Sequence, residues 1–105
     1  REEDGLALSS RNVYLEGVQR QEALVLIKAL KQAEEQIRGG ERDITRLIGA
    51  IKATIATSPQ AKIDYVEILN GDNLSGLERI EGRVLIALAV KFGKTRLIDN
   101  LLVEV

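Results

Sequence analysis

The spacing of the apolar residues changes at Pro59, and this change constrains the fold more than any other feature of the sequence. From about residue 18 to 38, and again from about 43 to 57, apolar residues recur every three or four positions, as in amphipathic helices. Beyond Pro59 the apolar segments are short and β-branched or alternating, which is typical of strands. Helices followed by strands predict an α+β domain of two layers, a helical hairpin packed on a small antiparallel three-stranded sheet.

Local signals mark the ends of both helices. Gly39 and Gly40 supply a stop for the first, because glycine readily takes the left-handed conformation common just past a helix end. Asp43 or Glu41 suits the positive end of the second helix dipole, and Pro59 excludes the helical conformation from the residue before it. The expected buried stripes are Ala23, Leu26, Ile27, Leu30, Ala33 and Ile37 in the first helix, and Ile44, Leu47, Ile48, Ile51 and Ile55 in the second.

Three strands are predicted after Pro59. Residues 63–69 are rich in β-branched and aromatic side chains, and residues 95–105 form the last strand. Residues 83–92 carry apolar side chains on both faces, so we expect them to be the central strand. The connections are a turn at residues 70–73, a polar loop at 74–82 with room for a short helical turn, and a turn at Gly93 and Lys94.

Length and charge exclude several classes of protein. The 105 residues fit one domain, and 15 basic against 16 acidic side chains argue against a nucleic-acid binder, which usually has a basic excess. No apolar run approaches the ~20 residues of a membrane span, and the charged residues 1–4 do not fit a signal peptide. Without cysteine there is no disulfide or thiolate chemistry, which fits a cytoplasmic protein.

The absence of histidine restricts catalysis further. Histidine is the commonest general base and a frequent metal ligand, and the chain contains none. Walker-type and Rossmann-type glycine patterns are also missing. We therefore expect no metal ligand in this chain and interpret it as one component of a site.

The best candidate for chemistry is the polar cluster Ser9-Ser10-Arg11-Asn12. Hydroxyls, adjacent backbone N–H groups and a guanidinium together supply several donors to phosphate oxygens. A loop that carries them can close over a triphosphate and stabilise the charge on departing pyrophosphate. Taken alone, the same four residues fit a solvated loop or a helix cap better.

Residues 1–15, Arg-Glu-Glu-Asp-Gly-Leu-Ala-Leu-Ser-Ser-Arg-Asn-Val-Tyr-Leu, closely resemble the segment that opens the C-terminal domain in the pantothenate synthetase (pantoate–β-alanine ligase) family. Similar segments follow at residues 40–42, 63–67 and 96–100, so the resemblance covers essentially the whole chain. The departures are small. Leu8 stands where many relatives have methionine, and Glu16-Gly17 replaces a Ser/Thr-Pro-like helix start.

This resemblance implies a ligase of coenzyme A biosynthesis. The family activates pantoate with ATP and Mg²⁺ to give pantoyl adenylate and pyrophosphate, and β-alanine then attacks the adenylate to release pantothenate and AMP. Its N-terminal Rossmann-like domain, absent from this chain, carries the histidine-containing nucleotide motif, the pantoate and β-alanine pockets and the homodimer interface. That domain would also hold most of the ATP and Mg²⁺, while the C-terminal domain acts as a mobile lid.

Carried onto this sequence, the resemblance makes Leu8, Ser9, Ser10 and Arg11 the ATP-binding residues. The two serines would give hydroxyl and backbone donors to the phosphates, and Leu8 would give backbone contacts and packing beside the adenine. Arg11 would supply the cation and act as the catalytic residue by stabilising charge in the transition state.

The implied domain, residues 1–105, divides into a hinge and phosphate-binding loop at 1–15 and a scaffold at 16–105. We expect it to be cytoplasmic, to bind neither nucleic acid nor membrane, and to be inactive without its N-terminal domain. The alternative is a stand-alone protein-interaction module whose apolar stripes or sheet edge bind a partner.

Other polar groups are predicted to be structural. Arg96, Asp99 and Asn100 could form a site, but a sheet-edge ion pair and turn-stabilising hydrogen bonds explain them better. Asp64 and Glu67, three apart on a strand, should point to opposite faces. The remaining groups are Glu34, Glu35 and Arg38, expected on a solvated helix face, and Arg1, Glu2 and Glu3, expected at the interdomain hinge.

Overall fold

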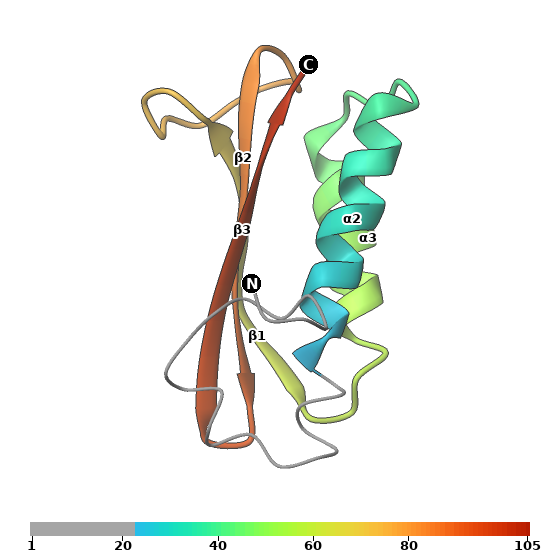
Figure 1. Cartoon of the computed structure of the whole chain (residues 1–105), viewed down its shortest axis with the longest axis vertical. Helices are drawn as coiled ribbons and strands as arrows, with labels where there is room; N and C mark the ends of the chain where they lie inside the picture. The colour runs from blue at the N-terminus through green and yellow to red at the C-terminus, as the bar shows by residue number, and fades with distance from the viewer. Residues whose placement is uncertain (1–22) are drawn as a thin grey trace.

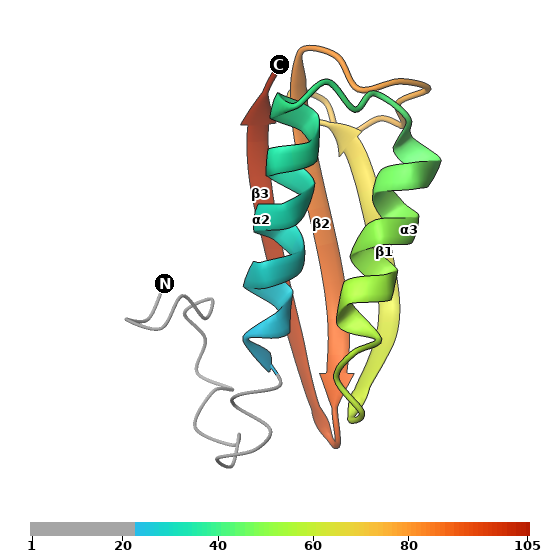
Figure 2. The ribbon, with the colours of Figure 1, turned by 90° about the vertical axis from the view of Figure 1, so that its right-hand side faces the viewer.

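Two helices pack against one face of a three-stranded antiparallel sheet in the computed structural model, which describes residues 23–105 (Figure 1). The elements, in chain order, are α2 (Val25–Arg38), α3 (Ile44–Ile55), β1 (Ala61–Asn70), β2 (Arg83–Phe92) and β3 (Thr95–Glu104). Helix α2 lies over β3 and α3 lies over β1, with β2 between them (Figure 2). This is the two-layer α+β arrangement predicted from the sequence.

The first helix ends at the predicted glycine pair. Gly40 has a φ of 110°, in the left-handed region that favours glycine. The N–H of Gly40 donates to the carbonyl of Ile37 at 3.1 Å, and that of Glu41 donates to the carbonyl of Gln36 at 2.9 Å. These two bonds form a Schellman motif, which satisfies carbonyls at the helix end. Arg42 adds a guanidinium bond of 2.7 Å to the carbonyl of Ile37.

The second helix begins at Ile44 with Asp43 as its N-cap, close to the predicted start at about residue 43. The Asp43 carboxylate accepts a bond from the N–H of Arg46 at 3.2 Å and so satisfies one of the free donors of the first turn. The helix ends at Ile55, and a turn leads to Pro59. The Thr54 hydroxyl donates to the Gln32 side chain at 2.8 Å, which joins the two helices on their exposed side.

The helix stripes were predicted correctly except at Ile27, since Ile44 and Ile48 of α3, although partly buried, pack against the core. Ile27 is only partly buried, whereas its neighbours Val25 and Ala29 lie in the core. The buried face of α2 is therefore centred on Leu26 and Leu30, and it extends toward Val25 and Ala29 and not toward Ile27. Helix α2 begins at Val25, after a turn at Leu24, and the earlier part of the predicted helix, residues 18–22, lies outside the described residues.

The three strands follow the order β1-β2-β3, so β2 is the central strand, as predicted. It pairs with β3 along its whole length, from Arg83 opposite Glu104 to Phe92 opposite Thr95, and with β1 from Val84 to Phe92. Gly93 and Lys94 form a two-residue hairpin turn, in which Gly93 has a φ of 63°. Glycine at the first position of such a turn matches the twist of the flanking strands.

The connection from β1 to β2 is a loop held by asparagine side chains. The side-chain oxygen Oδ1 of Asn70 accepts a bond from the N–H of Asp72 at 2.8 Å, and Oδ1 of Asn73 accepts one from the N–H of Ser75 at 3.0 Å. Gly76 bridges to Leu69 near the end of β1, and residues 74–82 contain no helical turn. Asparagine mimics a backbone turn in this way, which explains why this segment reads as turn-rich.

The core lies between the helices and the sheet. Alternate residues of β2 face the helices and are fully buried, and these are Val84, Ile86, Leu88, Val90 and Phe92. The other sheet face, here called the open face, has no described element packed over it (Figure 1). Its apolar members are Tyr65, Leu69, Leu85, Ala87, Ala89, Ile98 and Leu102.

Candidate functional site

The predicted ATP-binding residues lie outside the described residues. This holds for Leu8, Ser9, Ser10 and Arg11, and equally for the expected hinge residues Arg1, Glu2 and Glu3.

The polar set on β3 does not form one site. Asp99 lies opposite Leu88 on the helix-facing side and is 7% exposed, whereas Arg96 and Asn100 face the other way. Alternation along the strand thus separates the carboxylate from the two side chains beside it. The Asp99 carboxylate accepts a bond from the N–H of Asn100 at 2.8 Å, a local contact in the middle of β3 and not at a turn as predicted.

Arg96 forms a contact network on the open face. Its Nε donates to Asp64 Oδ2 at 2.9 Å, and its guanidinium lies 5.9 Å from the centre of the Tyr65 ring. Because Arg96 belongs to β3 and Asp64 to β1, the side chain crosses over the central strand. Ala89 of the central strand, on the same face, is fully buried although it lies outside the main core. The ion-pair interpretation of Arg96 is confirmed.

The prediction for Asp64 and Glu67 was wrong. The register of β1 against β2 shifts between Ile63 and Tyr65, so an extra residue enters the strand at Asp64. A bulge of this kind re-aims the side chains that follow it. Asp64 and Glu67 therefore both lie on the open face, but Asp64 is engaged by Arg96, and the two do not form an acid–base pair.

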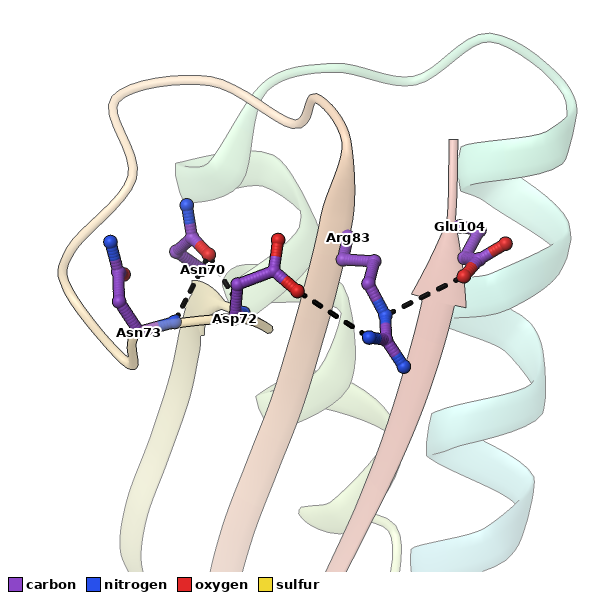
Figure 3. A network of polar contacts seen from close by, with 5 residues as sticks. All are labelled: Asn70, Asp72, Asn73, Arg83 and Glu104. Carbon is purple, nitrogen blue, oxygen red and sulfur yellow. Dashed lines mark hydrogen bonds and ion pairs between the residues drawn. The ribbon is translucent and has the colours of Figure 1, made fainter.

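Arg83, the first residue of the central strand β2, lies between Asp72 of the loop after β1 and Glu104 at the end of β3 (Figure 3). Its Nη1 lies 3.4 Å from Asp72 Oδ1, and its Nε lies 3.5 Å from Glu104 Oε1. All three side chains are about half-exposed or more, so each pair stabilises the fold only weakly. The pairing of Arg83 with Glu104 follows from the strand register, a signal that residue spacing alone does not give.

Two hollows lie at the end of α2 and the start of α3. One, of about 270 Å³, is lined by Ile37, Arg38, Arg42, Glu104 and Val105, and the other, of about 380 Å³, by Arg42, Asp43, Glu78 and Arg79. Arg42, which they share, already donates to two backbone carbonyls. The first hollow has two arginines against one glutamate, the second has two basic and two acidic side chains, and neither contains a nucleophile beside a base.

The described residues also lack the other usual signs of a catalytic centre. Ser58 has a buried hydroxyl that makes no hydrogen bond with them, so nothing there activates it as a nucleophile. Residues 23–105 bring together no group of three or more side chains suited to a metal ion. Glu34 and Arg38 form an exposed pair at 3.4 Å on the solvated side of α2, as predicted. None of the described helices is long and apolar enough to cross a membrane.

Comparison with known families decides where the chain belongs. The family model described as pantoate-beta-alanine ligase matches residues 1–102. The chain belongs to this family. The match includes the segment of Leu8, Ser9, Ser10 and Arg11 together with the two-layer domain up to residue 102, close to the end of β3.

Individual members of the ligase family are close in sequence. The chain is 60% identical to the pantothenate synthetase of Syntrophomonas wolfei over 105 residues, which are 100% of this chain and 37% of that protein. It is 56% identical to the pantothenate synthetase of Acetivibrio thermocellus over the same 105 residues, again 37% of the relative. The chain thus spans somewhat more than a third of the length of these relatives.

A solved member of the ligase family has the same fold. The pantothenate synthetase of Thermus thermophilus superposes on this chain with a TM-score of 0.88 and 38% sequence identity. The superposition covers 96% of this chain and 36% of the other. The domain described here is therefore one part of a larger architecture in that relative.

Proposed function

We propose that this chain is the C-terminal, ATP-covering domain of a ligase that condenses pantoate with β-alanine to make pantothenate. The observation that carries the proposal is the family match over residues 1–102, because it includes the one cluster in the sequence suited to phosphate binding. In this reaction ATP converts the pantoate carboxylate into an adenylate with loss of pyrophosphate, and the amine of β-alanine displaces AMP.

The residues proposed to contact ATP are Leu8, Ser9, Ser10 and Arg11. The serines would donate hydroxyl and backbone N–H bonds to phosphate oxygens, and Leu8 would pack beside the adenine. The guanidinium of Arg11 can donate two parallel bonds to a phosphate and remains charged at all relevant pH values. Arg11 therefore suits the stabilisation of charge that grows as pyrophosphate departs.

The described residues support a scaffold role for the rest of the chain. Their polar clusters are ion pairs and caps that hold strands and helices together, and the sequence has no histidine to act as a base. We therefore assign the pantoate and β-alanine pockets, the main ATP and Mg²⁺ contacts and the homodimer interface to an N-terminal domain. Cytoplasmic location and movement as a lid are part of the same proposal.

The role of Arg11 is tested in the full-length ligase. Arg11→Ala should lower the rate of pyrophosphate release by roughly 10²–10³, the range seen when one donor to a developing charge is removed. Arg38→Ala is the matched control, since Arg38 is an exposed arginine paired only with Glu34 among the contacts described and should leave the rate unchanged. An unchanged adenylation rate in Arg11→Ala would show that the proposed role is wrong.

The assignment of the catalytic groups to an N-terminal domain is tested with the 105-residue chain by itself. We expect no AMP release in the presence of ATP, Mg²⁺, pantoate and β-alanine, and weak ATP binding compared with the full-length ligase. Release of AMP that depends on β-alanine would contradict the assignment of the catalytic groups to another domain. The alternative of a stand-alone interaction module is disfavoured by the family match, since such a module has no need of a phosphate-binding segment.

A further inference from the structure

We infer that the open face of the sheet is a contact surface for a second copy of this chain, stacked face to face with its strands running the opposite way. This inference goes beyond the proposed function. The surface consists of residues other than the proposed ATP-binding residues and is distinct from the dimer interface expected in the N-terminal domain. It rests on the apolar character of the face, on its charge pattern and on its area.

The open face exposes large apolar side chains in the middle of the sheet. Ile98 is 58% exposed and Leu102 is 49% exposed, and both point away from the helices. Leu85 and Leu69, in the same row as Leu102, are half-buried. An antiparallel sheet with a solvated face normally carries polar residues there, so apolar side chains gathered on it indicate a contact surface.

Charged residues lie at both ends of this apolar region, with opposite balance. The row beside the β2–β3 turn contains Lys62, Lys91 and Arg96, together with the Asp64 carboxylate that Arg96 binds. The row at the far end contains Arg83 and Glu104, with Asp72 on the adjoining loop (Figure 3). The first end is therefore net positive and the second net negative.

The outward residues of β3 are self-complementary. In order they are Arg96, Ile98, Asn100, Leu102 and Glu104, so the pattern is cation, apolar, amide, apolar, anion. A two-fold axis through the row of Ala87 and Asn100, perpendicular to the strands, places Ile98 against Leu102 and Arg96 against Glu104 of the other copy. The same axis places Lys62 against Asp72. Isologous contacts of this type are the commonest in homodimers.

Like charges also meet in this arrangement, and they supply a test. Glu67, in the row of Ala87, meets its own copy, and Arg83 meets Lys91. Glu67 lies on the edge strand and is exposed, where water reduces the repulsion without removing it. Removing that charge should strengthen the contact, an effect that loss of folding cannot imitate.

The area of the face sets the expected strength. Three strands about 4.8 Å apart and about 33 Å long present roughly 450 Å² on each copy. A total of roughly 900 Å² lies below the ~1,200 Å² at which stable interfaces begin, so association should be weak, with Kd on the order of 100 μM. A weak contact is consistent with a surface that remains partly hydrated.

The first experiment is sedimentation equilibrium of the 105-residue chain from about 10 μM to about 1 mM, which brackets the expected Kd. We expect a monomer–dimer equilibrium that Leu102→Glu weakens at least about tenfold, because a buried carboxylate would lack a partner. Ala53→Glu, an exposed alanine on α3, is the control and should leave the Kd unchanged. A monomer throughout this range would overturn the inference.

The second experiment tests the axis. Glu67→Gln should tighten dimerisation by about threefold, since like charges that face each other are destabilising by a fraction of a kcal/mol to about one. The chain has no cysteine, so Ala87→Cys introduces a single thiol that a short bismaleimide should link to the same thiol of the other copy. Ala50→Cys, a half-buried alanine on α3, should not be linked. Weaker dimerisation in Glu67→Gln, or equal linking of both cysteine variants, would show that the copies do not meet as proposed.

Discussion

Gly40 is the residue whose backbone conformation most limits substitution. Its φ of 110° lies where a side chain is strained, although a methyl group there would have no atom within 4 Å. Gly40→Ala should therefore lower the free energy of unfolding by about 1 kcal/mol or more, through backbone strain alone. Urea denaturation followed by circular dichroism measures this change.

Gly49 provides the matched comparison, because the same substitution there should have the opposite sign. It lies inside α3, and a methyl group at this position also has no atom within 4 Å. Gly49→Ala should raise the free energy of unfolding by roughly 0.5–1 kcal/mol, since alanine is the better helix former. Destabilisation in both variants would mean that local packing, and not backbone conformation, controls these positions.

Sequence reasoning found the helix-ending role of the Gly39–Gly40 pair because glycine at a helix end has a local physical cause. Asp43 or Glu41 was predicted at the start of the second helix because of the helix dipole, and the structure adds a side-chain cap from Asp43 to a backbone donor three residues away. Arg83 and Glu104 were not paired from the sequence, because their contact depends on the register of β2 against β3. Local signals thus predicted the helix ends, while contacts between distant residues required the structure.

At the scale of elements, the two faces of the sheet should respond very differently to one substitution. Leu88 on β2 is fully buried against the helices, whereas Leu102 on β3 is 49% exposed on the open face. Leu88→Ala should cost about 2–5 kcal/mol, the range for a buried leucine that leaves a cavity. Leu102→Ala should cost roughly 0.5 kcal/mol or less, as for most surface positions.

Denaturant midpoints of these two variants check the assignment of the faces. Equal costs for Leu88→Ala and Leu102→Ala would mean that the open face is covered in the folded chain. A small cost for Leu102→Ala would also show that Leu102→Glu can be used in the association experiment without loss of the fold.

The elements themselves were largely predictable, and the errors have physical causes. The bounds of β2 were predicted at Arg83 and Phe92, because turns flank an apolar run of strand length. The bulge at Asp64 was not, since an inserted residue changes the face of a side chain without changing local composition. Ile27 was assigned to the core because periodicity gives the direction of an apolar stripe more reliably than its width.

At the scale of the whole molecule, the candidate site was found by resemblance to a family, whereas the fold was predicted from the pattern of apolar residues. The segment of Leu8, Ser9, Ser10 and Arg11 was identified by its resemblance to a family, and that family assignment is confirmed by the match over residues 1–102. The ATP contacts of these residues stay a prediction. A phosphate-binding loop acquires its geometry from the ligand and the facing domain, so the composition of four residues cannot specify it.

The fold, in contrast, is specified by one core that both layers share. The buried cluster joins Leu30 and Ile37 of α2 and Ile51 of α3 to Leu88 of β2 and Val103 of β3. Neither the helical hairpin nor the sheet can keep its apolar face from water without the other, so the domain should unfold in a single cooperative transition.

Calorimetry and hydrogen exchange measure this cooperativity in the 105-residue chain. The van't Hoff enthalpy should equal the calorimetric enthalpy, and the slowest amides of α2, α3 and β2 should exchange with the same free energy. Leu88→Ala should lower that free energy by a similar amount in all three elements, because the cavity lies in the core that they share. Loss of protection in the helices before the sheet would show that the two layers are stabilised separately and that the scaffold is not one rigid unit.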